Sequence, residues 1–359
     1  MSTSTLTGPA TPSGPAGPAG PTAPEPVEGA DGRPARVRSA RRPKGLLWLV
    51  LRQNRGALRT VAVLLVLVVS FLIAVHVLLQ DRVGLMQRTG CFTPQSWDRN
   101  VCWAQTGRVR LLTQLFTHVL QPAVTLLPAL IGMFLGGPML AQEYERGTVR
   151  MVLAQSVSPR RWLATRLAVP AVTVVLATAV LSALTSWVWW TDIIHGPVAF
   201  DPPFQGFTYP ALGVAPIAWS LFGLALGVLV GQLLRRTVAA VLVSGAAVAL
   251  AHGVVGVWRP FFWPMIEETQ PFNNRMGGFV QPANSWLVER GVVLADGTRM
   301  TSDECINLSN GCADAPTSWG QYHPVSHLVP VQLVEAGLLL LLTALVVAVV
   351  FRRLTRAGV

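Results

Sequence analysis

Long apolar blocks alternate with short polar segments along most of the chain. Six of these blocks reach about 20 residues, the length that an α-helix needs to cross the hydrocarbon core of a bilayer. We therefore predict an all-α membrane protein with six transmembrane helices. The predicted spans are 60–79, 119–141, 167–190, 214–234, 237–258 and 331–351. The pair Arg235-Arg236 separates the fourth span from the fifth, because arginines inside the bilayer are costly and a surface turn avoids that cost.

The segments before and after the spans differ from them in composition. Residues 1–43 are rich in proline, glycine and alanine and have few large apolar side chains, so we expect a disordered cytoplasmic tail. Residues 44–59 mix leucine, tryptophan and arginine, which favours an amphipathic helix lying in the membrane interface. An early start of the first span also fits this pattern. Residues 352–359 are expected to form a short cytoplasmic tail.

Composition points to a bilayer environment and away from nucleic acid. The 359 residues are 51% hydrophobic and 13% charged, whereas soluble proteins are about one-quarter charged. The net charge is +11, but the basic residues stand in short runs beside apolar blocks and not along a face with aromatic residues. We therefore expect the lipid bilayer as a partner and no nucleic acid.

The distribution of basic residues predicts the orientation. If the N-terminus is inside, the cytoplasmic segments hold 19 of the 28 lysines and arginines, as the positive-inside rule requires. These segments are 1–59, 142–166, 235–236 and 352–359. We predict a multi-pass protein of the cell membrane with both termini in the cytoplasm.

All four cysteines fall in the two predicted outer segments, 80–118 and 259–330. They are Cys91, Cys102, Cys305 and Cys312. Disulfides persist outside the cell, and four cysteines allow three connectivities. We expect each cysteine to pair with its neighbour in the same segment, with free thiols as the alternative. The spacing of neither pair suits a metal, so no metal site is predicted.

The longer outer segment, 259–330, also carries a hairpin signal. Asp296-Gly297 stands between β-prone residues in VVLADGTRMT. We expect a small outer cap, tied by a disulfide, and not an independent catalytic domain.

The most informative cytoplasmic segment is 142–166, which joins the second and third spans. It opens with EYERGT, in which Glu143, Glu145 and Arg146 crowd the exit of the second span. Gly147 and Thr148 then allow the helix to break.

The second half of this coupling loop predicts a helical elbow. Residues 148–155 can form a short interfacial helix, the predicted coupling helix. Ser158 is a helix N-cap and Pro159 suits the first position of the helix that follows. Arg160 and Arg161 would hold that start at the cytoplasmic surface. Such an elbow can pass a push from a soluble partner into two spans.

The loop resembles the first cytoplasmic loop of ABC transporter permeases of the type-two export class. Those loops carry an E-x-E-x-G-T run, a coupling helix and a restart with Ser/Pro followed by basic residues. The matching residues are Glu143, Glu145, Gly147, Thr148, Ser158, Pro159 and Arg161. The segment YHPVSHLVPVQLVE resembles the entry to the last span in actinobacterial members. Its matching residues are Tyr322, Pro324, Gln332 and Glu335.

The resemblance implies a transport subunit without catalysis of its own. Separate ABC ATPase subunits would bind ATP and magnesium, and this chain has no GxxxxGK[ST] loop that would bind them itself. The permease would form a homodimer, or a heterodimer with a similar permease. Glu145 and Arg146 are candidates for salt bridges to the ATPase; the alternative is that they only anchor the interface. The apolar spans favour a lipophilic or amphipathic cargo.

Glycines at four-residue spacing mark two of the spans as closely packed. They are Gly132, Gly136, Gly223, Gly227 and Gly231. Small residues at this spacing let helices approach closely. Packing within one subunit is one interpretation, and lining a dimer interface or a pathway is the other.

Two further polar features remain open. Glu335 is the only carboxylate well inside a span, so it is either paired structurally or placed in a wet outer vestibule, or it is part of a substrate or proton pathway. A proton-coupled secondary transporter would use it as a relay. His323 and His327 have the spacing of two metal ligands, but Pro324 disfavours a helix between them. A membrane-embedded enzyme is a third possibility, although no catalytic motif with recognisable spacing is present.

Overall fold

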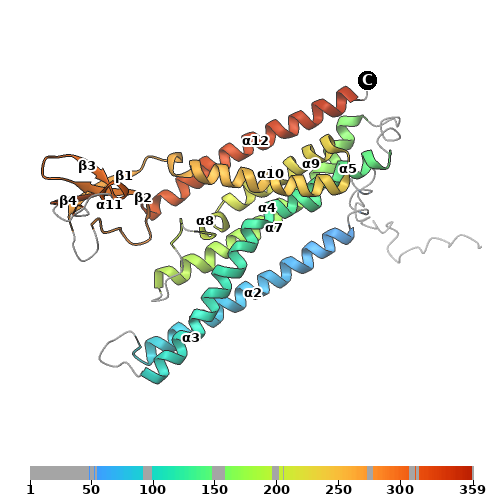
Figure 1. Cartoon of the computed structure of the whole chain (residues 1–359). Helices are drawn as coiled ribbons and strands as arrows, with labels where there is room; N and C mark the ends of the chain where they lie inside the picture. Colours follow the sequence, from blue (N-terminus) through green and yellow to red (C-terminus); the bar gives the residue numbers. More distant parts are fainter. Residues whose placement is uncertain are drawn as a thin grey trace, which may run out of the picture. The chain divides into compact units, whose positions relative to one another are not determined.

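The computed structural model describes six long stretches and a few further residues (Figure 1). These are 55–91, 99–147, 158–195, 206–272, 278–306 and 315–357, together with Trp48, Arg52, residues 202–204 and Cys312. The predicted tail 1–43, the predicted coupling helix 148–155 and most of the predicted interfacial helix 44–59 lie outside the described residues.

The described residues contain six helical segments that are long and apolar enough to cross a membrane, which confirms the main prediction. The second crossing is built from five consecutive pieces. The crossings are α2 (Arg55–Arg88); α3 (Arg99–Leu115), η2 (Phe116–Leu120), α4 (Gln121–Ile131), η3 (Gly132–Gly136) and α5 (Gly137–Glu145); α7 (Pro159–His195); α9 (Ala215–Leu234); α10 (Thr237–Trp258); and α12 (Leu328–Ala357). Short helical pieces connect them: α8 (Thr208–Ala211), η4 (Arg259–Phe262) and η5 (Val325–His327).

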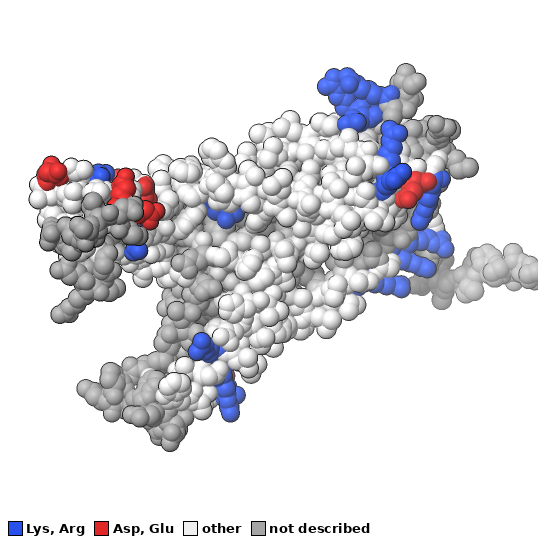
Figure 2. Space-filling view, in the orientation of Figure 1, with Lys and Arg blue, Asp and Glu red and all other residues white. Residues whose placement is uncertain are grey.

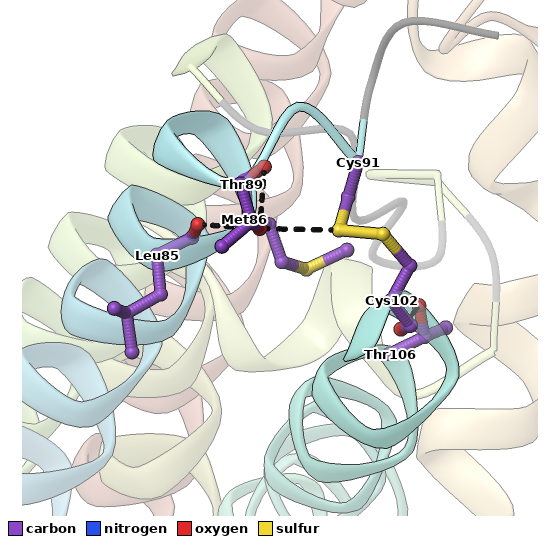
Figure 3. The surroundings of a disulfide bond; sticks show 6 residues. All are labelled: Leu85, Met86, Thr89, Cys91, Cys102 and Thr106. Atoms are coloured by element: carbon purple, nitrogen blue, oxygen red, sulfur yellow. Dashed lines mark hydrogen bonds between the residues drawn. A yellow bond between two sulfur atoms is a disulfide. The ribbon is translucent and has the colours of Figure 1, made fainter. Parts of the chain in front are cut away.

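The segment 80–118, predicted as an outer loop, is mostly helical. The α2 helix continues to Arg88 and α3 begins at Arg99. Polar residues in these stretches lower the hydropathy, so hydropathy does not predict a helix there, but they do not break it. A disulfide between Cys91 and Cys102 joins the two helix ends, with Cα atoms 5.5 Å apart (Figure 3). The end of α2 and the start of α3 are therefore covalently tied.

Two π-helical turns interrupt the second crossing. In each case a proline follows after one intervening residue: Pro122 in α4 follows η2, and Pro138 in α5 follows η3. A π-turn adds one residue, and it suits these places because a proline ring clashes with the carbonyl group one turn earlier in a regular helix. The crossing thereby continues through both prolines.

The central helix of the bundle is α9, whose most apolar stretch is 67% buried. The predicted glycines explain how the second crossing comes so close to it. Gly223, Gly227 and Gly231 face the backbone carbonyl groups of Pro128, Gly132 and Gly137, respectively. A Cβ atom on any of the three would collide with backbone and not with a movable side chain.

The same contact is tight from the opposite helix. A Cβ atom on Gly132 would lie 2.9 Å from the carbonyl oxygen of Gly223, and one on Gly136 would lie 2.6 Å from that of Leu224. All five predicted glycines therefore meet in one interface within a single chain.

A four-stranded antiparallel sheet lies between α10 and α12 in the chain, so the all-α prediction was wrong for this part. The strands are β1 (Ile266–Pro271), β2 (Trp286–Val293), β3 (Arg299–Thr301) and β4 (Thr317–His323), in the order β1-β4-β2-β3. The predicted hairpin is present: β2 pairs with β3, and Gly297 turns the chain with φ of 85°. A short helix, α11 (Ser302–Ile306), follows β3, and Cys305 bonds to Cys312 as predicted.

Candidate functional site

Basic side chains gather at one end of the helical bundle (Figure 2). At this end α5 stops, α7 starts, α9 turns into α10, and α12 finishes. Most acidic side chains in view lie instead on the sheet. The helix ends at the basic side therefore form the surface on which the predicted coupling residues lie.

Glu143 connects α5 to α7. Its Oε1 lies 2.7 Å from Nη2 of Arg166, and both side chains are partly buried. The guanidinium of Arg166 also lies over the ring of Trp162, 5.3 Å from its centre. A partly shielded ion pair of this kind fixes the start of α7 against the end of α5.

Tyr144, the next residue, contacts the turn between α9 and α10. The guanidinium of Arg235 lies 5.2 Å from the centre of the Tyr144 ring. Arg235 ends α9 in the left-handed conformation, with φ of 55°, and α10 begins two residues later. The predicted tight turn at Arg235-Arg236 is therefore confirmed.

Glu145 caps α10. Its Oε2 accepts hydrogen bonds from the backbone N–H of Thr237, at 3.1 Å, and from the Thr237 hydroxyl, at 2.5 Å. The first N–H groups of a helix have no partner within it, and the N-terminus carries a partial positive charge. Thr237 is the first residue of α10, so the Glu145 carboxylate satisfies that position.

Three consecutive side chains at the end of α5 thus contact three different places: the start of α7, the α9–α10 turn and the start of α10. We call Glu143, Tyr144 and Glu145 the α5 joint. A displacement of the segment that follows the α5 joint would therefore act on α7, α9 and α10 together.

The ends of the coupling loop have the local structure predicted for them. Gly147 ends α5 with φ of 71°, a conformation that favours glycine. Ser158 accepts a hydrogen bond from the N–H of Arg161, and Pro159 begins α7. Arg146, Arg160 and Arg161 are exposed, whereas Thr148 lies outside the described residues.

At the opposite end of the bundle, Glu335 lies at the centre of a buried polar cluster. Its side chain is fully buried, and its oxygens accept hydrogen bonds from Tyr209 Oη at 2.8 Å and Trp219 Nε1 at 2.7 Å. Arg259 donates two more, from Nε at 2.9 Å and Nη2 at 3.2 Å. The guanidinium of Arg259 also covers the ring of Tyr209, 4.1 Å from its centre.

The cluster joins four elements, because its members come from α8, α9, η4 and α12. Gln332, one turn before Glu335, donates to the backbone carbonyl of Leu212 at 3.0 Å. Four donor groups bind the Glu335 carboxylate, and its side chain has no exposed surface. This geometry agrees with the structural-pairing interpretation of Glu335.

A family model described as ABC-2 membrane transporter related matches residues 61–259, more than half of the chain. The chain belongs to this family. Comparison with curated proteins and with solved structures gives no match.

The family match runs from α2 to the first residue of η4. It includes the α5 joint, the coupling loop and the glycine interface of this ABC-2-related permease. The sheet and α12 lie beyond the matched residues, so Arg259 stands at the end of the matched region and its partner Glu335 outside it.

Sequence reasoning found Glu335 but not its partners. Arg259 belongs to the predicted outer segment 259–330, and the sequence alone does not single out Tyr209 or Trp219. One signal was available: Arg259 directly follows the fifth span, and Glu335 lies about one turn inside the sixth. A buried carboxylate needs a cation at its own depth, and Arg259 was at that depth.

His323 and His327 form a hydrogen-bonded pair. Their Nδ1 atoms lie 3.1 Å apart, and Nε2 of His323 lies 2.9 Å from the carbonyl oxygen of Pro260. A carbonyl only accepts, so His323 donates from Nε2 and accepts from His327 at Nδ1. Within the described residues, no group of three or more potential metal ligands is present.

Proposed function

We propose that this chain is the membrane-spanning subunit of an ATP-driven exporter in the cell membrane. Separate ABC ATPase subunits bind ATP and magnesium and drive it, and two permease chains, identical or similar, pair to form the pathway. The family assignment supports a permease, and the direction, cargo and partners are our inference.

The observation that carries this proposal is the α5 joint. The exposed arginines Arg146, Arg160 and Arg161 flank the coupling loop, while Glu143 and Glu145 are engaged within the chain. We therefore assign the contacts with the ATPase to the arginines and the loop between them. Because Glu145 binds Thr237, we assign it the role of passing the motion on to α10; its salt bridge to the ATPase stays a prediction.

The mechanism follows from these contacts. ATP-driven closure of the ATPase pair pushes on the coupling loop. The joint carries the push to α7, α9 and α10 together, because each is held by one of its three side chains. The close glycine interface moves α9 with the second crossing, so that the bundle rocks as a body and opens outward.

A lipophilic or amphipathic cargo suits the composition of the crossings. Within the described crossings, Glu335 is the buried carboxylate, and it is already bound by four donors. The same observation disfavours the alternative of a proton-coupled transporter, because a relay needs a carboxylate that exchanges its partners.

Purification from native membranes tests the proposal. We expect an ATPase with a phosphate-binding loop to co-purify in about equal amount with the permease, and transport by reconstituted vesicles to require ATP. If the chain carries no such ATPase and transport persists without ATP, the proposal fails.

A further inference from the structure

An apolar groove lies between α2, the second crossing and α7. Its volume is about 350 Å³. It extends from Leu58 to Val68 along α2, from Leu120 to Leu135 along the second crossing, and from Val169 to Leu181 along α7. No part of it belongs to the α5 joint or to the Glu335 cluster.

The chemistry of the lining selects a hydrocarbon. Nearly all the lining side chains are aliphatic. Thr173 and Thr178 carry the two hydroxyl groups, and both donate to their own helix, to the carbonyl groups of Val169 at 2.9 Å and Val174 at 2.7 Å. No lining hydroxyl group therefore needs a partner from the ligand. A polar ligand would lose its hydration in this groove and receive no hydrogen bond in return.

Along α2, the groove has the length of one bilayer leaflet. Leu58 and Val68 are ten residues apart on a helix, which corresponds to about 15 Å. The hydrocarbon core is about 30 Å thick, so each leaflet contributes about 15 Å. One acyl chain of a phospholipid spans that depth.

The register between α2 and α7 shows where the groove begins. The rings of His76 and Trp187 lie 4.0 Å apart between their centres and are tilted by 42°, so these two residues face each other. Leu58 and Val169 have the same offset in sequence, and both line the groove. Arg55 and Arg166 lie about one turn earlier on the same two helices.

Arginines therefore lie at the level where a phospholipid headgroup would be. Arg55 and Arg59 are exposed and make no ion pair with the described residues, whereas Arg166 is paired with Glu143. Exposed guanidinium groups at a membrane surface attract anionic headgroups.

We propose that this groove is a binding site for one acyl chain of an inner-leaflet phospholipid, with its headgroup near Arg55 and Arg59. An acyl chain in the groove contacts the protein on three sides, whereas an acyl chain of an ordinary boundary lipid contacts it on one side. The additional dispersion contacts keep this lipid bound longer than its neighbours. The bound lipid fills the space between α2 and the second crossing.

Filling the groove from the protein side tests this proposal. Ala123 lines the groove and is exposed there, so Ala123→Trp occupies the space of the lipid without displacing packed side chains. Ala177→Trp fills it from α7. The matched controls are Leu126→Trp and Leu176→Trp, on the same helices but outside the lining, at positions 57% and 63% exposed.

Native mass spectrometry of protein extracted in mild detergent gives the readout. We expect the wild-type chain and both controls to retain about one phospholipid per chain, and the two groove variants to retain at least about tenfold less. Equal retention in all five proteins would overturn the proposal. Retention of a cargo-like amphiphile in place of phospholipid would overturn it, and so would a second protein chain that covers the groove and leaves no lipid.

Discussion

At the residue scale, Glu335 shows how a carboxylate is held inside a span. Its oxygens receive four hydrogen bonds, two of them from the guanidinium of Arg259, whose side chain is 11% exposed. Such a pair contributes less to stability than its contacts suggest, because both groups lose their hydration. Removing one partner is different, since it leaves the other charge buried and unpaired.

We therefore predict that Glu335→Gln destabilises the chain by about 3 kcal/mol or more. The expected result is a clearly lower midpoint of thermal unfolding in detergent. The double variant Glu335→Gln with Arg259→Met removes both charges and should recover much of the loss. An unchanged midpoint in the single variant would contradict the buried pair.

His323 predicts a dependence of stability on pH. Burial lowers the pKa of this imidazole below its ordinary value of 6.5, because the charged form loses its hydration. The unfolded chain therefore takes up a proton at a higher pH than the folded chain does. The contribution to stability is fully present above pH 6.5 and decreases as the pH falls towards the folded-state pKa.

Unfolding midpoints measured between pH 8 and pH 5 would test this prediction. We expect the unfolding midpoint of the wild-type protein to decrease as the pH is lowered below about 6.5. In His323→Gln this decrease should be smaller. An identical pH profile in both proteins would show that His323 does not titrate in this way.

At the scale of elements, the glycine interface fixes the distance between α9 and the second crossing. Gly227 packs on the backbone of Gly132, whereas Gly256 in α10 has no atom within 4 Å of the position of a Cβ atom. The two glycines offer a matched comparison, since both lie within apolar crossings.

Gly227→Ala should destabilise the chain by about 1–3 kcal/mol, because the two helix backbones must separate. Gly256→Ala should be neutral or slightly stabilising, since alanine favours a helix more than glycine does. Thermal unfolding of both variants checks the sign. A stabilising Gly227→Ala would contradict the close contact.

Hydropathy alone predicted the six crossings, but not their lengths. The stretch from Arg99 to Phe116 is helical although its polar residues hide it from an apolar window, and the disulfide at Cys91 and Cys102 holds it in place. The hairpin at Asp296-Gly297 was predictable from turn chemistry. The pairing of β4 with β1 and β2 was not, since long-range strand order leaves no local signal.

The candidate site was predictable to a similar degree. Gly147, Ser158 and Pro159 act through local backbone geometry, which the sequence shows directly. The role of Glu145 was not predictable, because its partner Thr237 is 92 residues away along the chain. Distant pairing of polar groups becomes visible only when the helices are placed.

At the scale of the whole molecule, the basic end and the sheet lie in separate regions, as the proposed orientation requires. Natural cysteines do not interfere with a test of that orientation, since all four are in disulfides. Asp296→Cys places a thiol in the exposed β2–β3 turn, and Arg353→Cys places one near the end of α12.

A membrane-impermeant maleimide applied to intact cells should label the first variant and not the second. Labelling of both should occur once the membrane is opened. Labelling at Arg353→Cys and not at Asp296→Cys in intact cells would show the opposite topology. The α5 joint would then lie outside the cell, where the ATPase cannot contact it.

The most direct test of the account is a charge reversal beside the coupling loop. The double variant Arg160→Glu with Arg161→Glu changes two exposed side chains that make no ion pair with the described residues, while Arg352→Glu with Arg353→Glu makes the same change at the same end of the bundle. The amount of ATPase that co-purifies is measured against an equal amount of inserted permease. We predict at least about a tenfold loss for the first pair and near-normal recovery for the second. Equal recovery from both would contradict the assignment of this loop as the site where the ATPase drives the permease.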